Sequence, residues 1–146
     1  MNLNFGKIFE RKKDSPEIIQ EKENKIFEEA NVFISNFYKK IEEARKILET
    51  EDENADQSVL DKIKSLYIDA ESNLREVTDL LKQTVTGEEY FSIENSGNKD
   101  SLMLAQQEIV LEKTPFAVYP KMVKELINLK TDTLKKLMPE VSDLES

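Results

Sequence analysis

Apolar residues recur along this chain in two long heptad-like runs. The first run takes alternate steps of three and four residues through Phe27, Ala30, Ile34, Phe37, Ile41, Ala44 and Leu48. The second repeats this spacing through Leu60, Ile63, Tyr67, Ala70, Leu74, Val77 and Leu81. Such steps place the side chains on one stripe of an α-helix. With the short acidic connection between them, the two runs predict an antiparallel helical hairpin.

The sequence also indicates where the first helix begins and how it packs. Ser15 is a suitable N-cap and Pro16 suits the first helical position, so we expect a helix from Pro16 to about Thr50. Additional apolar residues widen its apolar face beyond a two-stranded seam, namely Ile26, Phe33 and Ile47. A face of that width typically packs against two neighbouring helices.

The second helix should run from about Ser58 to Thr86, after an acidic turn at residues 51–57. Asp56 or Ser58 can cap its start, and Gly87 is well placed to stop it. The next fourteen residues, 87–100, show no helical pattern and predict a long loop. That loop carries three apolar side chains close together, Tyr90, Phe91 and Ile93.

Two shorter helices complete the predicted fold. One begins near Ser101, includes Leu102, Ala105, Ile109, Val110 and Leu111, and ends before Pro115. The other restarts at Pro120 and runs to about Met138, with an apolar face of Val123, Leu126, Ile127, Leu134, Leu137 and Met138. We therefore predict an all-α fold, an antiparallel helical bundle with a long two-helix hairpin followed by two shorter helices. Residues 1–14 form an N-terminal amphipathic and basic segment, 15–139 the bundle domain and 140–146 a frayed tail.

Composition narrows the chemistry that 146 residues can support. The chain has no Cys and no His, which removes thiolate chemistry, the commonest general base near neutral pH and the usual zinc ligands. The acidic turn resembles the start of a calcium-binding loop, but Gln57 and Ile63 stand where such a loop needs Gly and a bidentate Glu. We expect no enzyme activity, no cofactor and no metal site.

Charge is unevenly distributed and overall acidic. The net charge is −9, and residues 14–57 alone carry six basic and thirteen acidic side chains, a net charge of −7. The negative electrostatic potential of this region repels nucleic acid and favours a basic protein partner. The simpler interpretation is that these charges keep a helical surface soluble.

The N-terminal segment is the one clearly basic part of the sequence. Phe5, Ile8 and Phe9 precede Arg11, Lys12 and Lys13, the reverse of the order in a secretory signal. As a helix, the segment could dock on a membrane surface or in a partner's groove. The alternative is an arm folded back on its own bundle. Since no stretch is apolar enough to span a bilayer, we expect a cytoplasmic protein.

The candidate partner-binding residues are Phe5, Ile8, Phe9, Tyr90, Phe91 and Ile93. The last three form a recognition patch if exposed, or a lid on the bundle end if packed. The sequence thus predicts a non-catalytic protein-interaction module, such as an adaptor, accessory subunit, inhibitor or immunity-type protein, with an acidic helical surface for its partner. The alternative function is a peripheral membrane-associated scaffold docked by residues 3–13. Both interpretations leave room for a homo-oligomer.

Overall fold

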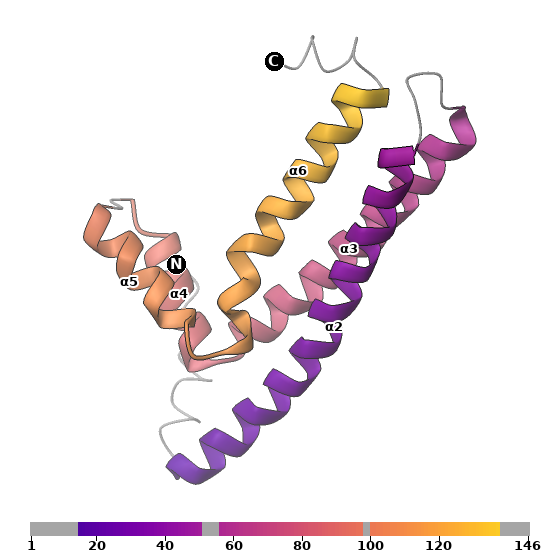
Figure 1. Cartoon of the computed structure of the whole chain (residues 1–146). Helices are drawn as coiled ribbons and strands as arrows, with labels where there is room; N and C mark the ends of the chain where they lie inside the picture. Colours follow the sequence, from indigo (N-terminus) through magenta and orange to yellow (C-terminus); the bar gives the residue numbers. More distant parts are fainter. Residues whose placement is uncertain (1–14, 51–55, 98–99, 138–146) are drawn as a thin grey trace. The chain divides into compact units, whose positions relative to one another are not determined.

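The computed structural model describes residues 15–50, 56–97 and 100–137 (Figure 1). Within these ranges all regular structure is helical. The helices, in chain order, are α2 (Pro16–Thr50), α3 (Gln57–Lys82), α4 (Val85–Glu94), α5 (Ser101–Leu111), the 3-10 helix η1 (Pro115–Val118) and α6 (Tyr119–Leu137). The predicted all-α bundle is confirmed, although the described residues contain one α-helix more than the four that the sequence indicated.

The starts of the two long helices follow the predicted capping chemistry. The backbone N–H of Ile18 donates to Ser15 Oγ at 3.3 Å, directly before the helical Pro16. The N–H of Val59 donates to the Asp56 carboxylate at 3.2 Å, which caps α3. Each cap satisfies a backbone donor that has no partner inside the helix.

The chain divides into two compact units, and α2 and α3 contribute residues to both. The second unit contains residues 32–77 and the described residues from 118 onward. Its core holds the middle and C-terminal part of the first predicted heptad stripe, most of the second stripe and one face of α6. The buried residues are Phe37, Ile41, Ala44, Leu48, Ile63, Leu66, Ala70, Val77, Met122, Leu126 and Leu129.

Within the second unit, α6 runs parallel to the C-terminal half of α2. Arg45 Nη1 donates to Asp132 Oδ2 at 2.5 Å, and one turn further along Lys136 Nζ donates to the Leu48 carbonyl oxygen. Leu48 lies in the last turn of α2, where carbonyl groups lack helical partners and the helix dipole favours a cation. On another side of α2, Lys40 pairs with Asp69 of α3 at 3.8 Å, so α2 has the two neighbours that its broad apolar face predicts.

The apolar face of α6 differs from the predicted one. Ile127 is 57% exposed, whereas Met122 and Leu129 are fully buried. Leu126 is buried as expected, and Val123, Leu134 and Leu137 are half-buried. The buried stripe of α6 is therefore rotated around the helix from the predicted one, and exposed Lys130 lies outside it.

The first unit contains the described part of residues 1–31 together with 78–117, and here the predicted end of the second helix and the predicted loop after it were wrong, whereas the helix from Ser101 was right. The helix α3 ends at Lys82, and residues expected to form a loop make α4. Thr84 is the N-cap, since its hydroxyl accepts from the Gly87 N–H at 2.8 Å and donates to the Leu81 carbonyl at 2.8 Å. Gly87 therefore lies in the first turn of a new helix and does not end the old one.

Gly87 permits this tight corner because it has no side chain. A β-carbon at this position would overlap the Leu81 carbonyl oxygen and approach the Thr84 hydroxyl. The start of α4 thus lies directly against the backbone at the end of α3. Elsewhere in the first unit, Phe116 is fully buried and makes an edge-to-face contact with Phe27 at a centroid distance of 5.9 Å.

Candidate functional site

The first unit contains a short helical hairpin of α4 and α5, which pack against each other (Figure 1). Asp100 caps α5 by accepting from the Met103 N–H at 2.8 Å. The eleven residues of α5 read Ser-Leu-Met-Leu-Ala-Gln-Gln-Glu-Ile-Val-Leu, so apolar residues surround the helix on all sides. A helix of this kind is normally buried on all sides. In this structure, however, only Gln107 and Leu111 of α5 are buried.

The inward face of α5 is held by a buried polar side chain. Gln107 is 7% exposed, and its Nε2 donates to Glu94 Oε2 at 2.6 Å and to the Tyr90 carbonyl at 3.5 Å. Both acceptors belong to α4, so this amide ties the two helices of the hairpin together. Leu111 packs beside it and is 1% exposed. These interactions fix which face of α5 points outward.

The outward face of α5 is apolar and open to solvent. Leu102 is 77% exposed and Ile109 is 65% exposed, and exposed Ala105 lies between them. Their spacing of three and four residues places them on one stripe, about 180° around the helix from Gln107 and Leu111. We call Leu102, Ala105 and Ile109 the α5 stripe. Leu104, on a neighbouring side of the helix, is 46% exposed.

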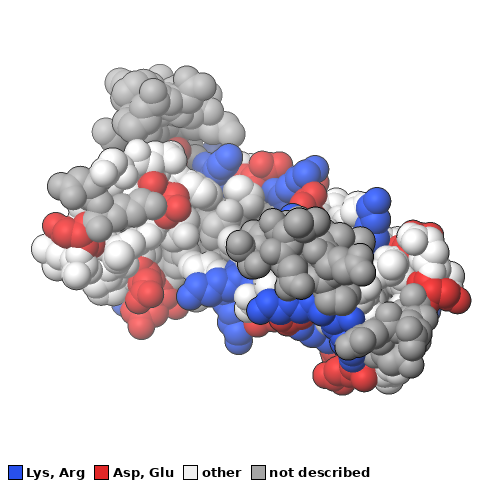
Figure 2. Space-filling model, turned by 90° about the horizontal axis from the view of Figure 1, so that it is seen from above, with Lys and Arg blue, Asp and Glu red and all other residues white. Residues whose placement is uncertain are grey.

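The hairpin that carries this stripe is rich in carboxylates. Between Val85 and Glu112 the described residues carry six acidic side chains and no basic one: Glu88, Glu89, Glu94, Asp100, Glu108 and Glu112. Figure 2 shows red and white atoms over the hairpin at the left of the view, whereas red and blue are interspersed elsewhere on that face. Lys99 lies outside the described residues, and Lys113 follows directly after the hairpin. The hairpin is thus apolar and locally anionic.

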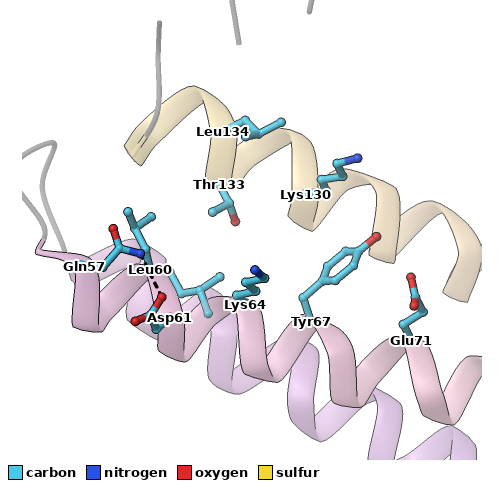
Figure 3. A pocket seen from close by; sticks show the side chains of 10 residues that line it. Gln57, Leu60, Asp61, Lys64, Tyr67, Glu71, Lys130, Thr133 and Leu134 are labelled. Atoms are coloured by element: carbon cyan, nitrogen blue, oxygen red, sulfur yellow. Dashed lines mark hydrogen bonds between the residues drawn. The ribbon is translucent and has the colours of Figure 1, made fainter. Parts of the chain in front are cut away.

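A second candidate is a groove between α3 and α6 within the second unit, with a volume of about 610 Å³ (Figure 3). Its apolar wall includes Leu60, Ile63 and Leu134, and the hydroxyl of Tyr67 lies near its rim. The charges along it are mixed, because Lys64 and Lys130 alternate with Asp61 and Glu71. Because the lining carries both positive and negative charges, it does not favour a ligand of either charge. No group of acidic side chains suited to a metal ion occurs in the described ranges.

Two side chains outside these surfaces have shifted pKa values. Burial, and then the nearby charge of Glu125, raise the pKa of Tyr38 above its ordinary value of 10.0. The Tyr38 hydroxyl is buried, and no hydrogen-bond partner for it occurs among the described residues. Hydrogen bonds from the Ser58 hydroxyl and then the Val59 N–H lower the pKa of Asp56 at the α3 cap. Neither group lines the groove between α3 and α6, and we assign no chemistry to them.

The residues singled out from the sequence are placed as follows. Phe5, Ile8 and Phe9 lie outside the described residues. Tyr90 and Ile93 are each 7% exposed and face the interior of the first unit. Phe91 is half-buried, stacks edge-to-face on Tyr90 at 5.2 Å and has Lys82 Nζ 5.5 Å from its ring centre. The residues of the α5 stripe were identified as part of a helix but not as a surface, although the lack of any polar face on α5 was visible in the sequence.

Comparison with known proteins gives no further guidance. No family model, no curated protein and no solved structure matches this chain. Among the described helices, none is both long and apolar enough to cross a membrane.

Proposed function

We propose that this protein is a non-catalytic protein-interaction module that binds its partner through the anionic surface of the α4–α5 hairpin. The observation that carries the proposal is the α5 stripe, on which Leu102 and Ile109 are 77% and 65% exposed. Contiguous exposed apolar residues rimmed by polar ones are typical of protein–protein contact sites. The acidic surroundings agree with the basic partner expected from the net charge of −9.

The structural setting also supports binding more than catalysis. The stripe is a convex helical face, without the enclosed cleft in which carboxylates acquire the shifted pKa values of general acids and bases. A rigid helix that presents side chains in fixed positions suits recognition. The proposal keeps the cytoplasmic location that we expect from the sequence.

The proposal is tested by affinity capture from the native cell followed by mass spectrometry. The bait is the full chain, compared with the double variant Leu102→Gln/Ile109→Gln. The control bait is Ile68→Gln/Ile127→Gln, which changes two residues that are also exposed, at 53% and 57%, but lie in the second unit. We expect a partner that is captured by the full chain and the control and lost from the α5 variant. A partner set that is the same for all three baits would refute the assignment.

A further inference from the structure

The α5 stripe and its rim specify the chemistry of the occupant more closely than the proposed function does. We propose that the stripe binds a cationic amphipathic α-helix of a protein partner, with apolar side chains over Leu102 and Ile109 and Lys or Arg beside Glu108 and Glu112. This inference rests on the proposed function, because it assumes that the hairpin is the binding surface. Its support comes from the shape of the stripe, the charges at its edges and the poor fit of other occupants.

The shape of the stripe suits a helix. Leu102 and Ile109 are seven residues apart, which is two helical turns or about 10 Å. The small side chain of Ala105 leaves a shallow saddle between these two larger ones. A partner helix can place one side chain of its own ridge in that saddle, as helices do when ridges pack into grooves. Recognition by anchors at i, i+3, i+4 and i+7 is a common mode for amphipathic helices.

The charges at the edges select a cation. Glu108 and Glu112 are both exposed and lie one turn apart along one edge of the stripe. Glu112 keeps helical backbone angles as the C-cap of α5, so it remains in register with Glu108. The opposite edge is formed by uncharged Gln106, with Lys113 just beyond the hairpin. A partner helix with Lys or Arg beside its apolar face would therefore meet opposite charge on the carboxylate edge.

Other occupants meet the same carboxylates unfavourably. A second copy of this chain that paired stripe to stripe in antiparallel orientation would bring its own Glu108 and Glu112 against the same pair, and like charges in contact are repelled. An anionic membrane surface is disfavoured for the same reason.

The stripe is also preorganised for binding. The bonds from Gln107 to Glu94 and to the Tyr90 carbonyl hold α5 on α4 from the other side. The Asp100 cap holds the first turn of α5 in place. Because the helix is already fixed, little ordering of its backbone opposes association.

The experiment measures binding of a designed probe to the full chain by fluorescence anisotropy. The probe is a labelled peptide of about 18 residues with Leu on one helical face and Lys elsewhere, and a matched peptide carries Glu in place of Lys. We expect the Lys peptide to bind and the Glu peptide to fail. Leu102→Gln/Ile109→Gln should weaken binding of the Lys peptide about tenfold or more, because both apolar anchors are lost.

Charge-matched variants separate the site from general electrostatic attraction. Glu108→Lys/Glu112→Lys and Glu28→Lys/Glu29→Lys change the net charge equally, and all four of these glutamates are exposed. We expect the first pair to weaken binding about tenfold and the second much less, because Glu108 and Glu112 lie along the edge of the α5 stripe whereas Glu28 and Glu29 belong to α2. Equal losses from both pairs, or no binding of the Lys peptide to the unaltered chain, would overturn the proposal.

One further variant tests the stripe without removing an apolar anchor. Ala105→Arg fills the saddle with a cation and should abolish binding. Each variant must keep the circular dichroism spectrum and urea midpoint of the parent, which shows that it is folded. Binding that rises about tenfold on deletion of residues 1–13 would identify the chain's own basic segment as the occupant. Self-association that depends on Leu102 and Ile109 would identify a second copy of this chain as the occupant and overturn the proposal. Sedimentation with anionic phosphatidylglycerol vesicles that depends on the same residues would identify a membrane surface as the occupant.

Failure of this inference can be told apart from failure of the proposed function. If cellular capture depends on Leu102 and Ile109 but is indifferent to Glu108→Lys/Glu112→Lys, the hairpin is the binding surface and the cationic helix is wrong. If capture is indifferent to both pairs, the proposed function itself fails.

Discussion

At the scale of single residues, Tyr38 has a hydroxyl that is buried without a hydrogen-bond partner among the described residues. Removing an unsatisfied polar atom without changing the shape of the ring should not harm the fold. We expect Tyr38→Phe to be neutral or to stabilise the protein by up to about 1 kcal/mol, measured by urea unfolding at pH 7. A clear loss of stability would mean that the hydroxyl has a partner.

The same residue makes a prediction about alkaline pH. The pKa of Tyr38 is raised above 10.0 in the folded protein by burial and by Glu125, so folding favours the protonated phenol. That contribution to stability is fully present below about pH 10 and is lost as the pH rises through the folded pKa. Tyr38→Phe should therefore lose less stability than the parent between neutral pH and the alkaline range. If the parent and Tyr38→Phe lost the same free energy of unfolding between neutral and alkaline pH, this account would be wrong.

The two glycines of the first unit that lie within the described residues provide a matched pair. Gly87→Ala should destabilise the protein by about 1–3 kcal/mol, because the added methyl group collides with a backbone carbonyl that cannot rotate away. Gly97→Ala adds the same atom where no other atom lies within 4 Å, and neither glycine has a positive φ. Thermal melts should show a lower Tm for the first variant only. If both variants melted at a similar temperature, the close packing of Gly87 against the end of α3 would be wrong.

At the scale of elements, the α4–α5 hairpin depends on a neutral buried amide. Gln107→Glu places a second carboxylate in a buried position beside Glu94. The two negative charges repel each other, and this repulsion destabilises the folded protein. We expect a loss of about 1–3 kcal/mol at pH 7. The folded pKa of the new group would be raised, so the stability should return as the pH falls below its unfolded value. Gln106→Glu adds the same charge at an exposed position and serves as the control in urea melts at pH 7 and at acidic pH.

The hairpin also shows why helical patterns predict some elements better than others. In α2 and α3 one buried stripe repeats over several turns, so the spacing identifies both the helix and its inward face. In α4 the buried residues are Gly87, Tyr90 and Ile93, a pattern only two turns long that begins with a glycine. That glycine follows an apparently complete helix and therefore resembles a stop. In α5 apolar residues on every side predict a helix but cannot indicate which side is covered.

At the scale of the whole molecule, Phe37 tests the heptad prediction on which the fold rests. It is fully buried in the second unit, as the first run of apolar residues indicates. Phe37→Ala should reduce the free energy of unfolding by about 3–5 kcal/mol, as truncation of buried aromatic residues does. Val32→Ala, at a 58% exposed position of the same helix, should change it by less than about 0.5 kcal/mol. A urea midpoint that is unchanged by Phe37→Ala would refute the core assignment.

The candidate site was harder to predict than the fold for a physical reason. Burial leaves a periodic signature in a sequence, and Phe37, Ala44 and Val77 follow that signature. Exposure of Leu102 depends on whether another element covers it, which is a property of tertiary packing. Of the apolar residues that the sequence singled out, Tyr90 and Ile93 are buried residues of α4, each 7% exposed.

The parallel register of α2 and α6 has a consequence for how the chain is made. The groups that join these helices are separated by 87 and 88 positions, from Arg45 to Asp132 and from Leu48 to Lys136. At typical rates of translation, about 4–17 s pass between synthesis of one partner and the other. During that interval the side of α2 that α6 covers in the folded protein has no α6 to pack against, so it can be buried only after α6 has been made.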